Sequence, residues 1–123
     1  MRDTEHYIQE SCVGWFNIQY PQLRGLLFAV PNGGARNLAT GRRLKDEGVV
    51  AGVADLLFLY PHFGLTTQTT FWGLCIEMKS PKGYQSPSQK SWQKLVEAQG
   101  YKYVVCHSLD EFMSTINEYI QKD

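Results

Sequence analysis

"LCIEMKSPKG" (residues 74–83) is an apolar segment that gains two charged side chains, Glu77 and Lys79, before it stops at Pro81. Alternate residues of a β-strand lie on the same face, so Glu77 and Lys79 point the same way. A carboxylate and an ammonium group at the rim of a core are costly unless they are paired or take part in function. The segment therefore predicts a buried strand that ends in a polar site.

A second apolar segment, "ADLLFLYP" (residues 54–61), precedes the first one along the chain. A loop of roughly ten residues between them, centred near Thr66, favours an antiparallel hairpin. The apolar residues of both segments do not alternate with polar ones, which predicts that both faces of the two strands are covered. In the register that this hairpin predicts, Leu57 lies opposite Cys75 and Asp55 lies opposite Glu77.

Three charged side chains share one face in this register, because opposed residues of paired strands lie on the same side of a sheet. They are Asp55, Glu77 and Lys79. Two neighbouring carboxylates repel each other unless a cation lies between them, and Mg²⁺ prefers oxygen ligands. Such an ion would polarise a phosphoryl oxygen and supply hydroxide, while Lys79 steadies the attack on a phosphodiester. The alternative is a salt bridge at the rim of the sheet between Lys79 and one of the carboxylates.

The other elements follow from apolar periodicity and from the residues that begin and end helices. One capping box is formed by Ser86 with Gln89, and a second by Ser108 with Glu111. The pattern describes an α/β domain with a mixed sheet between helices. Helices are expected over residues 4–20, 35–48 and 86–100 and from residue 108 onward, and strands within residues 25–34, 54–61, 70–81 and 101–107.

The length and composition fit an ordinary globule. The 123 residues are 43% hydrophobic and 20% charged, which predicts a single domain over residues 1–123. Twelve basic residues balance twelve acidic ones, so the overall charge does not indicate a nucleic-acid partner. The three cysteines form no CxxC pair, which argues against a zinc site or a disulfide framework. With no signal peptide or membrane span in the sequence, a cytoplasmic protein is expected.

Taken in order, three segments resemble the VRR-NUC (virus-type replication-repair nuclease) domain of the PD-(D/E)xK nuclease superfamily. They are "GVADLLFL" (residues 52–59), "CIEMKSPKG" (residues 75–83) and "SPSQKSWQKLVEAQGYKYVVC" (residues 86–106). The resemblance runs from about residue 4 to residue 106, and Ala54 stands where the family often has proline. The matching residues are Glu5 with Gln9, Asn32 with Gly33, Gly52 with Asp55 and Leu56, Glu77 with Lys79, and Gln89.

The resemblance implies a restriction-endonuclease-like core, in which a mixed β-sheet is flanked by helices. It also implies a structure-specific, Mg²⁺- or Mn²⁺-dependent DNA endonuclease that resolves Holliday junctions as a homodimer. The implied catalytic residues are Asp55, Glu77, Lys79, Glu5 and Gln89, and the implied metal ligands are Asp55, Glu77 and Glu5. Expected DNA-binding residues are Asn32, Arg36, Arg42, Arg43 and Lys82.

Alternatives remain open at this stage. The activity could be that of a flap, end or nicking nuclease of DNA repair or phage replication, or the chain could be a non-catalytic DNA-binding module on the same fold. Gln89 could serve the capping box, the site or both. Glu10 lies in the same expected helix as Glu5, and the basic cluster that includes Arg42 could be a solvated helix face.

Overall fold

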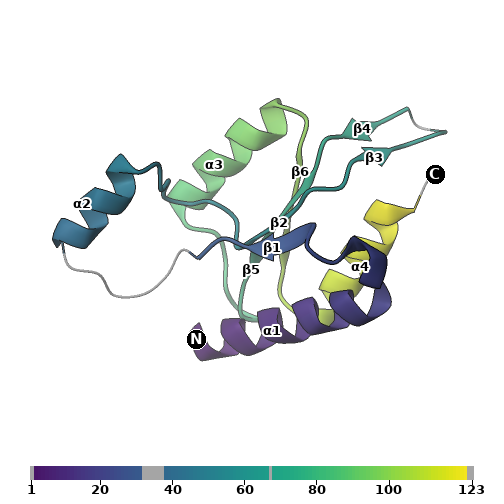
Figure 1. Ribbon diagram of the computed structural model, residues 1–123, viewed down its shortest axis with the longest axis horizontal. Helices are drawn as coiled ribbons and strands as arrows, with labels where there is room; N and C mark the ends of the chain where they lie inside the picture. Colours follow the sequence, from purple (N-terminus) through teal and green to yellow (C-terminus); the bar gives the residue numbers. More distant parts are fainter. Residues whose placement is uncertain (1, 32–37, 67, 122–123) are drawn as a thin grey trace.

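The protein is built on a four-stranded mixed sheet. The computed structural model describes residues 2–31, 38–66 and 68–121. The strands lie in the order β1-β2-β5-β6; the first three pair antiparallel, and β6 runs parallel to β5 (Figure 1). This arrangement confirms the predicted α/β class with a mixed sheet flanked by helices. The strands are β1 (Leu27–Ala29), β2 (Leu56–Phe58), β5 (Leu74–Met78) and β6 (Lys102–Cys106).

Helices cover the two faces of this sheet unequally. Two helices, α1 and α4, pack on one face, and α3 packs on the other (Figure 1). A fourth helix, α2, lies to the side of this body. The helices are α1 (Arg2–Gln19), α2 (Leu38–Asp46), α3 (Pro87–Ala98) and α4 (Leu109–Ile120), and the short 3₁₀ helix η1 (Pro21–Leu23) follows α1.

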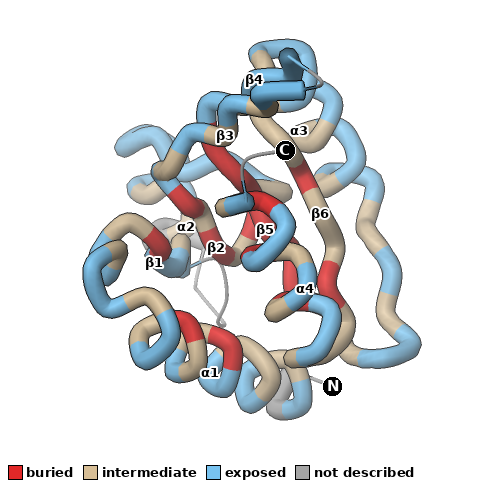
Figure 2. Tube along the Cα trace, turned by 90° about the vertical axis from the view of Figure 1, so that its right-hand side faces the viewer, coloured by how far each residue is buried: buried red, intermediate tan, exposed pale blue. Residues whose placement is uncertain are grey.

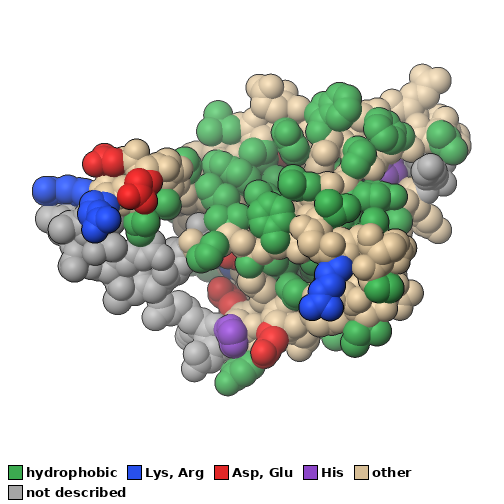
Figure 3. Space-filling view, viewed as in Figure 1, with side chains coloured by type: hydrophobic (Ala, Val, Ile, Leu, Met, Phe, Trp, Pro, Cys, Tyr) green, Lys and Arg blue, Asp and Glu red, His purple; other side chains and the backbone are tan. Residues whose placement is uncertain are grey.

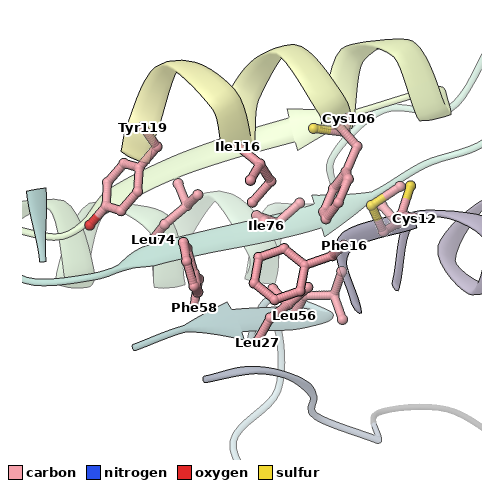
Figure 4. Close-up of a cluster of buried hydrophobic side chains, with 12 residues drawn as sticks. Cys12, Phe16, Leu27, Leu56, Phe58, Leu74, Ile76, Cys106, Ile116 and Tyr119 are labelled. Atoms are coloured by element: carbon pink, nitrogen blue, oxygen red, sulfur yellow. The ribbon is translucent and has the colours of Figure 1, made fainter. Parts of the chain in front are cut away.

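The larger apolar cluster lies between the sheet and the pair of helices α1 and α4. Phe16 of α1 and Phe58 of β2 meet edge to face, with ring centroids 5.3 Å apart. Figure 4 shows these rings with Ile76 of β5 and Ile116 of α4 pointing into the same space. The helical spacing of apolar residues in α1 thus places one stripe of side chains against the sheet, as the periodicity predicts.

Strand β5 is the central element of the core. All five of its residues are buried, which confirms that both of its faces are covered (Figure 2). Leu57 pairs with Cys75, so the predicted register with β2 is also confirmed. A smaller apolar cluster under α3 contains Ala54, Cys75 and Tyr103. Cys12, Cys75 and Cys106 are all free thiols and buried.

The segment between β2 and β5 differs from the expected loop. It forms a separate two-stranded sheet from β3 (His62–Phe63) and β4 (Thr70–Phe71), which projects beyond the main sheet (Figure 1). The prediction of one long strand over residues 70–81 was therefore wrong. The ladder is interrupted where residues 59–61 face Trp72 and Gly73, because the two sides contribute unequal numbers of residues.

Helices α3 and α4 begin directly after their predicted capping residues, Ser86 and Ser108. Ser86 and Gln89 form the full capping box of α3. The Ser108 hydroxyl accepts from the Glu111 N–H as predicted, but the Glu111 carboxylate accepts from the N–H of His107, at 2.7 Å, rather than from that of Ser108. The second capping box is thus half formed. Across the described helices, no segment is long and apolar enough to cross a membrane.

Candidate active site

Glu77 is the centre of a buried polar cluster on the α3 side of the sheet. Its side chain is 2% exposed. The Gln89 side-chain amide donates to Glu77 Oε2 at 2.7 Å, and the Tyr103 hydroxyl donates to Oε1 at 3.4 Å. The Lys79 ammonium lies 3.7 Å from Oε2 and is 14% exposed. Both carboxylate oxygens of a residue that sits in the middle of a core are therefore satisfied.

The same environment changes the acidity of Glu77. Burial, together with the neighbouring charge and hydrogen bond of Asp55, raises the pKa of Glu77 from 4.5 to about 8. Lys79 and Tyr103 act in the opposite direction without cancelling the effect. At neutral pH and without a cation, the pair of carboxylates consequently retains a proton.

Asp55 lies directly before β2, next to Glu77, and lines an open cavity. Its Oδ2 accepts a hydrogen bond from the backbone N–H of Met78 at 2.7 Å. The cavity has a volume of about 480 Å³ and lies beside the N-terminal half of α1. Its lining residues are Glu5, His6, Gln9, Glu10, Val13, Ala29, Val30, Pro31, Asp55 and Met78. The carboxylates of α1 and that of Asp55 therefore line the same cavity.

Glu5 and Glu10 both line this cavity, but they differ in their contacts. Glu5 Oε2 accepts from the backbone N–H of Ser80, at 3.4 Å, in the turn that follows β5. Glu10 is exposed. Glu5 is thus the helix carboxylate that is tied to the segment carrying Lys79.

Gln89 serves the helix start and the buried carboxylate at once. Its Oε1 accepts from the Ser86 N–H at 2.8 Å, and its Nε2 donates to Glu77. The first turn of α3 also presses against Gly52, where a Cβ atom would lie 2.4 Å from the Ser88 carbonyl oxygen. Gly52 has a positive φ of 85°, so both conformation and space call for glycine before Asp55.

The described residues do not form a ready-made metal cage. Within residues 2–31, 38–66 and 68–121, no group of three His, Cys, Asp or Glu side chains is gathered so that it could hold a metal ion. Glu77 is turned toward Gln89 and Tyr103, whereas Asp55 and Glu5 face the cavity.

The predicted DNA-binding residues that the structure describes lie in two places. Arg42 and Arg43 are exposed on α2, and Lys82 is exposed in the turn after β5. Figure 3 shows Lys and Arg side chains at the α2 end of the molecule, and hydrophobic side chains over the centre of this face. Asn32 and Arg36 lie outside the described residues.

Tyr103 is a member of the cluster that sequence reasoning missed. In the parallel pairing of β5 with β6, Tyr103 lies opposite Cys75, on the face that also carries Glu77. Its ring packs against Trp92 of α3, and burial raises the pKa of its hydroxyl. A signal was present in the alternation of "YKYVVC", but its use requires knowing that β6 pairs with β5.

Fold and site together define a restriction-endonuclease-like α/β domain, with Asp55 directly before β2 and with Glu77 and Lys79 at the end of the neighbouring strand β5. Comparisons with known proteins agree with this class. The model of the VRR-NUC domain family matches residues 4–110. A solved structure described as a VRR_NUC domain protein is 27% identical, with a TM-score of 0.79 over 95% of this chain and 88% of that chain. No curated protein matches.

The chain therefore belongs to the VRR-NUC domain family. The resemblance stated from the sequence is confirmed, and its extent agrees with the matched range. Membership makes the chain a nuclease domain of the PD-(D/E)xK type.

Proposed function

We propose that the protein is a metal-dependent, structure-specific DNA endonuclease that cuts branched DNA as a homodimer. The observation that carries this proposal is the buried Glu77, held by Gln89 beside Lys79 and against Asp55. A carboxylate that retains a proton near neutral pH, beside a second carboxylate and a lysine, is typical of a cation site rather than of a structural salt bridge. Gln89, Glu5 and the acidic pair are accordingly assigned to the catalytic centre.

The residues present fit a hard divalent cation. Mg²⁺ keeps several waters and is held by one or two carboxylates, so a site need not supply a closed cage. Asp55 and Glu5 open into a cavity of about 480 Å³, which has room for a hydrated ion, and Glu77 lies next to Asp55. Asp55, Glu77 and Glu5 would hold Mg²⁺ or Mn²⁺. When bound, such an ion polarises a phosphoryl oxygen and lowers the pKa of water.

The protein's own groups then act on the substrate. Gln89 fixes the orientation of Glu77, because its amide is itself fixed by the Ser86 cap. Lys79 places a positive charge beside the carboxylates, where it neutralises charge that develops on the phosphate. Lys79 is still partly accessible, so a phosphate that enters from the solvent can reach its ammonium group.

DNA binding would rely on local basic surface, since the net charge is zero. Arg42, Arg43 and Lys82 are exposed, and Asn32 and Arg36 complete the proposed set. Two copies related by a two-fold axis would double this surface and present two sites to a four-way junction, which needs two cuts. Light scattering at working concentration tests the homodimer, and a strictly monomeric active protein would contradict it.

The decisive test is a nicking assay on matched DNA structures with Mg²⁺, Mn²⁺ or EDTA. We expect cleavage with either metal, none in EDTA, and a preference for four-way junctions over linear duplex. Asp55→Asn should lose activity, whereas Asp110→Asn, an exposed aspartate of α4, should retain it. A preference for flaps, ends or nicked DNA would instead identify the protein as a flap, end or nicking nuclease. Binding of DNA without cleavage in any metal would identify a non-catalytic module.

A further inference from the structure

The turn after β5 carries two of the lysines on which the proposed function rests. The Gly83 N–H donates to the Ser80 carbonyl at 2.8 Å and closes residues 80–83 into a tight turn. A Cβ atom on Gly83 would lie 3.3 Å from Cβ of Lys79, so the turn folds back onto the stem of that lysine. Lys82 stands exposed within the turn. The placement of residues 80–83 therefore affects Lys79 and Lys82 together.

Two side chains tie this turn to the rest of the fold. Glu5 of α1 holds its first residue through the Ser80 N–H. His107, directly after β6, holds its last residue, with Nε2 3.1 Å from the Gly83 carbonyl oxygen. The backbone beside the turn is already fixed, because the Lys79 N–H donates to the Cys106 carbonyl at 2.9 Å. His107 thus closes the turn against the end of a well-supported strand.

Both ring nitrogens of His107 face oxygens that can only accept. Nε2 lies against the Gly83 carbonyl, and Nδ1 lies 3.3 Å from a carboxylate oxygen of Glu111. A neutral imidazole carries one N–H and can satisfy one of these acceptors, whereas the imidazolium carries two. The hydrogen-bonding pattern around the ring is therefore complete only in the charged form.

Glu111 contacts both the backbone and the ring of His107. Its carboxylate accepts the His107 backbone N–H at 2.7 Å, and this bond, followed by the contact with the ring, lowers the pKa of Glu111. The half-formed capping box of α4 is the local consequence, since Glu111 is engaged with His107 instead of the Ser108 N–H. An ionised carboxylate consequently stands beside the ring.

We propose that His107 is a positioning residue of the nuclease, whose imidazolium clamps residues 80–83 and so sets the placement of Lys79 and Lys82. The proposal rests on the proposed function and deepens it by adding a proton-dependent contact outside the carboxylate cluster. Ionisable groups on the packed elements are Glu111 and Asp110 of α4, Lys82 of the turn, the buried thiol of Cys106 in β6, and Glu5 of α1. Loss of one ring proton would leave one of the two acceptors without a donor and so weaken the clamp.

The first experiment needs no cleavage. Backbone amide signals of residues 80–83 are followed by NMR in the metal-free protein from pH 5 to 9, together with the His107 ring. We expect the signals of the turn to titrate with the His107 ring in the natural protein and not in His107→Gln. Turn signals that do not follow the ring, or that titrate unchanged in His107→Gln, would overturn the proposal.

The second experiment measures cleavage of one DNA substrate with Mg²⁺, as variant-to-natural ratios, so that the common pH dependence of hydrolysis cancels. His107→Gln should be about tenfold slower at pH 6 and should approach the natural protein at pH 8.5. His107→Arg keeps a cation at every pH, so it should match the natural protein at pH 6 and exceed it at pH 8.5.

His62→Gln provides the matched control, because His62 bonds the Tyr119 carbonyl at the projecting hairpin, away from the turn. Its ratio should stay constant with pH. A constant ratio for His107→Gln would overturn the clamp. If the amide signals titrate as expected and no DNA is cut at any pH, the clamp stands and the proposed nuclease function fails.

Discussion

The two faces of the central sheet are built on the same strand and have opposite characters. Leu74, Ile76 and Met78 of β5 point into the large apolar cluster beneath α1 and α4. Cys75 and Glu77 alternate with them and point toward α3, where Glu77 meets Asp55, Gln89 and Tyr103. One face is therefore almost wholly apolar, and the other contains a buried carboxyl group whose pKa is raised.

This contrast shows how a small domain can hold a costly group. Burying a carboxylate disfavours folding, and the cost is tolerable when a neighbouring region supplies surplus stability. Here the surplus comes from the face that carries no polar cluster. Substitutions on the apolar face should accordingly change stability, whereas those on the polar face should change chemistry with small or opposite effects on stability.

Ile76→Ala should produce the largest loss of stability. Ile76 is fully buried in the large cluster, and truncation removes its contacts and leaves a cavity, at a cost of about 2–5 kcal/mol. Urea unfolding of the metal-free protein measures the change. Ile18→Ala is the control, since Ile18 is 83% exposed on α1 and should cost less than about 0.5 kcal/mol. Equal midpoints for the two variants would contradict the assignment of this face.

Lys79→Met should affect turnover rather than folding. The change keeps most of the stem and removes the charge, so cleavage should fall by about 100- to 1000-fold while the unfolding midpoint stays close to that of the natural protein. Single-turnover cleavage with Mg²⁺ measures the effect. Lys94→Met, at an exposed position of α3, should cleave normally. Unchanged turnover in the Lys79 variant would show that this lysine is a salt-bridge partner alone.

Glu77→Gln should abolish cleavage and yet stabilise the metal-free protein. Because the pKa of Glu77 is raised from 4.5 to about 8, the folded protein keeps a proton that the unfolded chain releases between these values. The free energy of unfolding therefore falls as pH rises through this window. The glutamine variant lacks that loss, so its gain in Tm should be larger at pH 8 than at pH 5.

Calorimetry at the two pH values checks the sign, with Glu118→Gln as an exposed control on α4. A gain in Tm that is the same at both pH values would mean that Glu77 is ionised throughout. Addition of Mn²⁺ should stabilise the natural protein and leave the glutamine variant nearly unchanged, because a bound ion replaces the proton.

Tyr103→Phe should have the smallest effect of these substitutions. It tests whether a hydroxyl group on the polar face affects metal affinity rather than stability. It removes the hydroxyl that donates to Glu77 while the ring stays against Trp92. The lost bond, worth about 0.5–1.5 kcal/mol, raises the pKa of Glu77 further, so Mn²⁺ affinity near pH 7 should fall several-fold. Isothermal titration with the metal alone measures this.

Tyr119→Phe is the counterpart on the apolar face. Its hydroxyl donates to the Tyr60 carbonyl at 2.7 Å, so its loss should lower stability by a similar amount and leave Mn²⁺ affinity unchanged. Equal changes in Mn²⁺ affinity for the two phenylalanine variants would contradict the assignment of metal binding to the α3 face of the sheet alone.

Much of this architecture can be predicted from local sequence patterns. The pairing of Leu57 with Cys75 follows from two apolar segments and a connecting loop, and the Ser86 capping box follows from four consecutive residues. The projecting hairpin of β3 and β4 was missed because Thr-rich sequence reads as loop, and its strands are only two residues long. Such short strands depend on packing against the rest of the domain, here on contacts of His62 and Phe71 with Tyr119, rather than on their own propensity.

The polar cluster also combines contacts that the sequence predicts with contacts that only the tertiary structure reveals. The face shared by Asp55, Glu77 and Lys79 was predictable, because the period of a strand and the register of a hairpin are set by neighbours along the chain. The double role of Gln89 could be stated as an alternative, and the structure shows both contacts. Tyr103 and His107 could not be placed, since both depend on β6 lying parallel to β5 after a long crossover.

Local rules therefore account for the places of the four main-sheet strands, the starts of α3 and α4, and the order of the charged residues, because each depends on only a few consecutive positions. Tertiary packing decided the rest. It buried Glu77 enough to shift its pKa, turned that side chain toward α3, and brought Gly83 to the ring of His107. Those features arise from the dielectric environment and from contacts between residues far apart in the chain, and no short stretch of sequence encodes either one alone.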